Sequence, residues 1–80
     1  MEKSDWQNVA KNLLKAELKK RGLSYADLHA KLEEVGVNES LGGIKVKLSR
    51  GTFSAVFLLQ CLSAIGCENL RIESALFKQE

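Results

Sequence analysis

The chain has 80 residues, of which 45% are hydrophobic and 28% charged, with a formal net charge of +2. These values predict one small globular domain and exclude a disordered chain, and a charge this small does not by itself indicate a nucleic-acid binder. The longest apolar run, residues 55–59, is too short to cross a bilayer, and the polar start predicts no signal peptide. We expect Cys61 and Cys67 to be reduced thiols of a cytoplasmic protein.

The charged residues are clustered along the chain. Residues 11–21 hold five basic side chains against the single acid Glu17, and residues 40–67 hold Lys45, Lys47 and Arg50 without any acid. Such clustering can form a basic face on a nearly neutral protein. A solvated helix surface explains the first cluster equally well.

Apolar residues that recur at intervals of three and four predict helices along most of the chain. The first helix is expected over residues 5–21, capped by Ser4 or Asp5 and ended by Gly22. Its apolar side includes Glu17, a carboxylate that needs a partner or a route to water.

The second helix is expected to begin at a capping box formed by Ser24 and Asp27 and to end at Gly36. The third, residues 40–50, contains two adjacent glycines, so tertiary packing must hold it in place. It is expected to end at Gly51.

The fourth helix is expected between a cap at Thr52 or Ser54 and a stop at Gly66. Its surface is apolar nearly all round, which predicts the central buried element of the fold. The tail, residues 67–80, fits a short strand, a final helical turn or a flexible segment.

Three segments of the chain resemble the Cro/phage-repressor family of bacterial DNA-binding domains. Residues 14–28 resemble its first two helices, residues 48–51 (Leu-Ser-Arg-Gly) resemble the end of its third, and residues 57–66 resemble its fourth. The chain also looks like a group of small bacterial proteins catalogued only as a domain of unknown function. The resemblance implies an all-α bundle of four to five helices with a helix-turn-helix, in a single domain of residues 1–80 with its core at residues 5–66.

The chain departs from the Cro/phage-repressor pattern at several positions. Tyr25 stands where a DNA-contacting glutamine is common, and His29 replaces an alanine, so its ring must widen the helix crossing or turn outward. Ser49 replaces a glutamate that in the family pairs with a basic residue on the first helix. We therefore predict a reversed ion pair between Glu17 and Arg50.

The outer surface of the third helix is the candidate DNA interface. A base-reading helix usually presents Arg, Gln or Asn side chains, whereas this helix presents mostly small groups, with its donors near its C-terminal end. Basic and hydroxyl side chains suit phosphates, although each charge could equally serve only solubility. The predicted contacts are Lys45, Val46, Lys47, Ser49, Arg50 and Thr52.

The sequence therefore predicts a non-catalytic DNA-binding protein, a small bacterial transcriptional regulator with weak contacts dominated by phosphates. The alternative is a protein-interaction module on the same scaffold that does not bind DNA and uses the apolar tail or the third helix. No motif indicates an enzyme, a metal, a cofactor or a small-molecule substrate. DNA-binding proteins of this type commonly form homodimers, and the tail, Trp6 or Phe53 could supply the contact.

Overall fold

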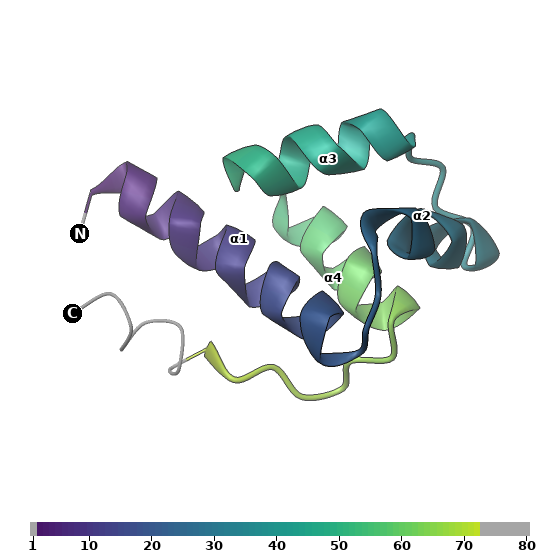
Figure 1. Ribbon diagram of the computed structural model, residues 1–80. Helices are drawn as coiled ribbons and strands as arrows, with labels where there is room; N and C mark the ends of the chain where they lie inside the picture. Colours follow the sequence, from purple (N-terminus) through teal and green to yellow (C-terminus); the bar gives the residue numbers. More distant parts are fainter. Residues whose placement is uncertain (1, 73–80) are drawn as a thin grey trace.

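The computed structural model of the protein describes residues 2–72 (Figure 1). This part of the chain contains four helices and no strand. The helices are α1 (Lys3–Lys20), α2 (Tyr25–Glu34), α3 (Leu41–Arg50) and α4 (Ala55–Ala64). The all-α prediction is confirmed.

The three short helices each begin at a serine. The hydroxyls of Ser24, Ser40 and Ser54 each accept a hydrogen bond from the backbone N–H three residues later, at 3.0–3.1 Å. At Ser24 the predicted capping box is complete, because the Asp27 carboxylate accepts from the Ser24 N–H at 2.8 Å. The structure therefore confirms the predicted cap of α2 and selects Ser54 from the two caps predicted for α4.

The start of α1 differs from the prediction. Its N-cap is Glu2, whose backbone N–H donates to the Asp5 carboxylate at 3.1 Å, so the helix begins before both predicted caps. Asp5 lies in the first turn, where a carboxylate also interacts favourably with the helix dipole. The predicted stops, in contrast, are confirmed, since a glycine with φ between 66° and 81° follows each helix, at Gly22, Gly36, Gly51 and Gly66.

The helices share one hydrophobic core. α1 packs against α3, and α2 packs against both α3 and α4 (Figure 1). The buried side chains that meet between them are Leu14, Leu18, Leu28, Leu32, Ile44, Leu48, Phe57, Cys61, Leu62 and Ile65. Those of α1, α2 and α3 lie on the apolar helix sides that the periodicity predicts, so the pattern identified this part of the core.

The burial of α4 corrects the prediction of a fully enclosed helix. Val56 and Leu59 are each 64% exposed, because the few elements of this small domain cover α4 on one side only. Trp6 is also exposed, at 53%, although it shares a side with the core residues of α1. Phe53 is partly buried against Phe57, with ring centroids 5.7 Å apart, so it does not offer an exposed contact for a dimer.

The segment after α4 runs back along the molecule beneath α1 (Figure 1). Residues 67–71 have no regular secondary structure, and the remaining part of the predicted tail, residues 73–80, lies outside the described residues. Within residues 2–72, no helix combines the length and the apolar character that crossing a membrane requires.

Candidate nucleic-acid interface

The orientation of α3 is set by two fully buried side chains, Ile44 and Leu48. Positions on the opposite side of the helix therefore face solvent, and their residues are exposed. Thr52, just after the helix, is exposed as well. We call this surface the α3 face; it consists of Lys45, Val46, Ser49, Arg50 and Thr52. It brings together five of the six predicted contact residues and includes no acidic side chain.

Lys47, the sixth predicted contact, is engaged within the fold. Its Nζ lies 2.8 Å from an Oε of Glu39 and 4.6 Å from the centroid of the Phe57 ring. These contacts link α3 both to the segment before it and to α4, and the Lys47 side chain is 37% exposed. Lys47 is therefore less available to a phosphate than Lys45. The sequence did not predict the pair between Lys47 and Glu39. Glu39 lies before the helix, so the helical spacing does not fix its position relative to Lys47.

The end of α3 lies against α1. Gly51 is buried with φ 68°, and a Cβ at this position would overlap the backbone carbonyl oxygen of Gln7. Only glycine allows this approach, because other residues would add both a clash and left-handed strain. The contact holds the C-terminal end of the α3 face beside the first half of α1, where Lys11 follows Gln7 by one turn.

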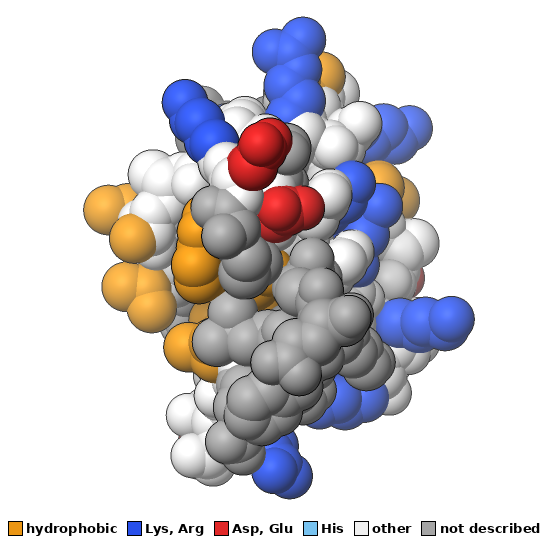
Figure 2. Space-filling view, turned by 90° about the vertical axis from the view of Figure 1, so that its left-hand side faces the viewer, with side chains coloured by type: hydrophobic (Ala, Val, Ile, Leu, Met, Phe, Trp, Pro, Cys, Tyr) orange, Lys and Arg blue, Asp and Glu red, His pale blue; other side chains and the backbone are white. Residues whose placement is uncertain are grey.

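Basic side chains are numerous at the end of the molecule at which α1 begins. Figure 2 views this end and shows Lys and Arg side chains projecting at its upper, right-hand and lower edges, hydrophobic side chains along its left edge, and acidic side chains in its upper middle part. The sequence also places a row of lysines on one side of α1, at Lys11, Lys15 and Lys19. The α3 face is thus one part of a wider distribution of positive charge.

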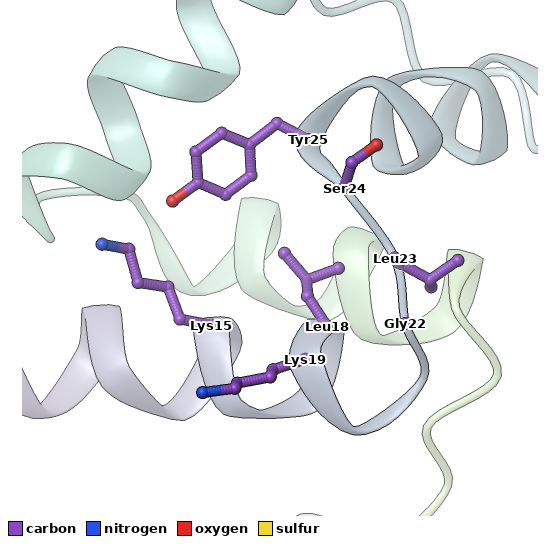
Figure 3. Close-up of a pocket in the computed structure, with 7 residues that line it drawn as sticks. All are labelled: Lys15, Leu18, Lys19, Gly22, Leu23, Ser24 and Tyr25. Carbon is purple, nitrogen blue, oxygen red and sulfur yellow. The ribbon is translucent and has the colours of Figure 1, made fainter.

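A hollow of about 600 Å³ lies between the end of α1 and the start of α2 (Figure 3). Lys15, Lys19 and Tyr25 border it, and Leu18 and Leu23 add apolar lining. Neither lysine forms an ion pair within the described part of the chain. The row of lysines was visible in the sequence, but the approach of Tyr25 was not, because it depends on how α2 packs.

Glu17 is 6% exposed and is paired locally. Its two carboxylate oxygens lie 2.7 Å from Arg21 Nη1 and 3.1 Å from Lys20 Nζ. These partners replace the predicted Arg50, which is exposed at the far end of α3. The local pairing prevails because residues three and four apart on a helix face one another, whereas a pair with Arg50 requires a tertiary approach.

The Glu17 carboxylate also contacts the segment after α4. The Cys67 thiol donates to it, with Sγ 3.5 Å from Oε1. The hydrogen bond from Arg21 lowers the pKa of Glu17 below its usual 4.5, burial acts in the opposite direction, and Lys20 and Cys67 lower it further. Glu17 therefore helps to hold residues after α4 against α1.

The other polar side chains that the sequence singles out are His29, Cys61 and Cys67. The His29 side chain is 31% exposed, with Nδ1 3.7 Å from Glu33 Oε1, so the ring turns outward. Both cysteines are free, and burial raises the pKa of the Cys61 thiol to about 12. Among residues 2–72, no group of three His, Cys, Asp or Glu side chains is placed to hold a metal ion.

A protein-family model matches most of the chain. Residues 6–70 match the family described as "Domain of unknown function (DUF6471)". Neither a search of curated proteins nor a search of solved structures found a match. The matched region includes α2, α3 and α4 together with the α3 face. The protein therefore belongs to the DUF6471 family.

Proposed function

We propose that this protein binds DNA without catalysing a reaction, and that the α3 face contacts the phosphate backbone. The observation that carries the proposal is the composition of this face. Lys45 and Arg50 are exposed there beside the hydroxyls of Ser49 and Thr52, with no acidic residue among them. Cationic and hydroxyl donors on one rigid helix suit phosphate oxygens.

The same face favours weak binding with little base discrimination. Val46, which is 49% exposed, and Ser49 offer no bidentate hydrogen-bonding group to a base edge. Lys47 already contacts Glu39 and Phe57. Lys45 and Arg50 remain as the principal cations of the face, and both suit a phosphate. Affinity should therefore depend strongly on salt concentration and weakly on sequence.

We further propose that α2 and α3 act as a helix-turn-helix of the Cro/phage-repressor type. α2 packs against α3, and residues 35–40 connect the two helices. In this arrangement α3 approaches the major groove and its exposed cations reach the flanking phosphates. The role that fits is a small bacterial transcriptional regulator in the cytoplasm, where its two free thiols stay reduced.

The experiment that tests DNA binding compares two exposed lysines of equal charge. Lys19 lies near the end of α1, about 18 Å along the helix from the contact between Gln7 and Gly51. Lys45→Gln should weaken binding to a fluorescent random-sequence duplex several-fold. It should also reduce the slope of log affinity against log salt by about 1. Lys19→Gln should change both quantities less.

Two outcomes would count against the proposal. If the wild-type protein fails to bind the duplex at low salt, the DNA-binding role is wrong. If Lys19→Gln weakens binding as much as Lys45→Gln does, the protein binds DNA through diffuse attraction to its whole basic surface and not through a defined interface at the α3 face.

One observation favours the second candidate function, a protein-interaction module. Large apolar side chains are exposed at Val35, Val56, Leu59 and Ile72. Ile72 belongs to the predicted tail, and the other three lie on or beside α4, so these side chains favour the tail and α4 over the third helix as the contact surface. Salt separates the two functions, because phosphate binding weakens as ionic strength rises whereas an apolar interface persists.

A further inference from the structure

An uncharged apolar surface lies on the exposed side of α4. Val56 and Leu59 are each 64% exposed, Ser63 is exposed one turn further on, and Val35 and Ile72 flank them at 53% and 50%. We call these five residues the α4 face. No residue of α4 itself is charged. A contiguous apolar surface of this kind on a small domain indicates an interaction site.

The α4 face has both a projection and hollows. Leu59 and Ser63 border two hollows, one of about 710 Å³ and one of about 380 Å³. The larger is also lined by apolar side chains, Leu58, Leu62, Leu70 and Ile72, and by one acid, Glu68. The smaller is also lined by Val35, Val37 and Gln60. Leu59 therefore stands on a ridge with a mainly apolar hollow on either side. Packing between helices requires this shape, in which the ridge of one surface enters the groove of another.

These features fit a second copy of the same chain. In a two-fold symmetric interface the same surface meets itself, so projection and hollow must lie on one face. Residues near the symmetry axis meet their own copies, and a charge there would meet a like charge. The α4 face satisfies both conditions, because its ridge lies beside its hollows and none of its five residues is charged. The one acid that lines the larger hollow, Glu68, follows α4 and is not part of the face.

We propose that the protein forms a two-fold homodimer through the α4 face, with Leu59 of each copy seated in a hollow beside Leu59 of the other. The α3 and α4 faces share no residue, so the dimer leaves Lys45 and Arg50 exposed. The proposal does not rest on DNA binding, and either can fail without the other.

The first test measures the monomer–dimer equilibrium by sedimentation from micromolar to near-millimolar protein. Leu59→Arg places like charges beside each other at the interface and should raise the dissociation constant roughly thirtyfold or more. Val46→Arg is the matched control, since Val46 is a similarly exposed apolar residue on α3. It should leave the dissociation constant within about twofold. Circular dichroism verifies that both variants keep their helices.

The second test needs no variant. Isotope-filtered NOEs in a mixture of labelled and unlabelled wild-type protein should connect the Leu59 methyl groups of one copy with α4 of the other. A wild-type chain that stays monomeric throughout overturns the proposal. So does a dimer that survives Leu59→Arg, or one whose intermolecular NOEs avoid α4. Persistence of the dimer at high salt supports an apolar interface.

Discussion

α3 and α4 are built alike but present different surfaces. Each has ten residues, a serine N-cap whose hydroxyl binds the third N–H of the helix, and one side buried in the common core. The exposed side of α3 carries Lys45 and Arg50, whereas that of α4 carries Val56 and Leu59 and no charge. The same helical scaffold thus offers one surface suited to phosphates and one suited to another apolar surface.

The α3 and α4 faces are linked through residues that lie beneath them. Lys47 of α3 lies over Phe57 of α4, and the two helices are separated only by the turn that contains Gly51. Substitutions on one outer face should therefore leave the other face intact. Substitutions at the residues that link the two helices, such as Lys47 and Gly51, should affect both faces. The following variants test this difference, in order of decreasing effect on stability.

Gly51→Ala should have the largest effect. The added Cβ overlaps the Gln7 carbonyl oxygen and the backbone has φ 68°, so we expect a loss of roughly 3 kcal/mol in the free energy of unfolding. Gly66→Ala is the control, because its φ is 75° but nothing lies within 4 Å of the new Cβ. It should lose about 1 kcal/mol. Equal losses in denaturant unfolding would mean that α1 and α3 do not meet at Gly51.

Glu17→Gln should cost roughly 2 kcal/mol, because Arg21 and Lys20 lose their anion and the Cys67 thiol loses a charged acceptor. Neither outer face contains these residues, so the α3 and α4 faces should both persist in the variant. Chemical denaturation measures the loss. An unchanged midpoint would show that the buried carboxylate contributes no net stability.

The same carboxylate predicts how stability depends on pH. Because the pKa of Glu17 is lowered in the folded protein, its contribution is present above about pH 4.5 and is lost as pH falls through the lower folded value. Asp27, whose pKa is lowered by hydrogen bonds from Ser24, acts in the same direction. The difference in unfolding free energy between wild type and Glu17→Gln should therefore shrink below pH 4.5. A difference that stays constant contradicts this assignment.

Lys47→Gln should cost about 1 kcal/mol, since it removes the ion pair with Glu39 and the cation above the Phe57 ring. It should weaken DNA binding less than Lys45→Gln does, because Lys47 supports the α3 face from inside the fold. Anisotropy and thermal unfolding of the two variants measure the contrast. The reverse ranking would make Lys47 a direct phosphate contact.

Gly42→Ala should have the smallest effect and the opposite sign. Gly42 lies within α3 and has open space around its Cβ position, so alanine should stabilise the protein by about 0.5–1 kcal/mol. Val46 and the rest of the α3 face should be unchanged. A loss of stability in calorimetry would show that Gly42 allows a close contact with another segment of the protein, a contact that is absent from the described part of the structure.

Local features of the chain were predictable from the sequence, and features set by packing were not. The box at Ser24 and Asp27 depends on residues three apart, so it could be read directly. The pair between Glu17 and Arg21 could also have been predicted, because Arg21 follows Glu17 by four residues on the same helix. The resemblance favoured Arg50 instead. The exposed side of α4 could not be located, because a helix that is apolar all round shows no periodicity to mark its covered side.

An NMR titration of the labelled protein with a random-sequence DNA duplex tests the claim that the α3 face binds phosphates. At low salt we predict shifts confined to the amides of residues 44–53, reversed at moderate salt, with little change at Leu59 on the α4 face. Absence of shifts at low salt, or shifts centred on Leu59 that persist as salt rises, would contradict the claim.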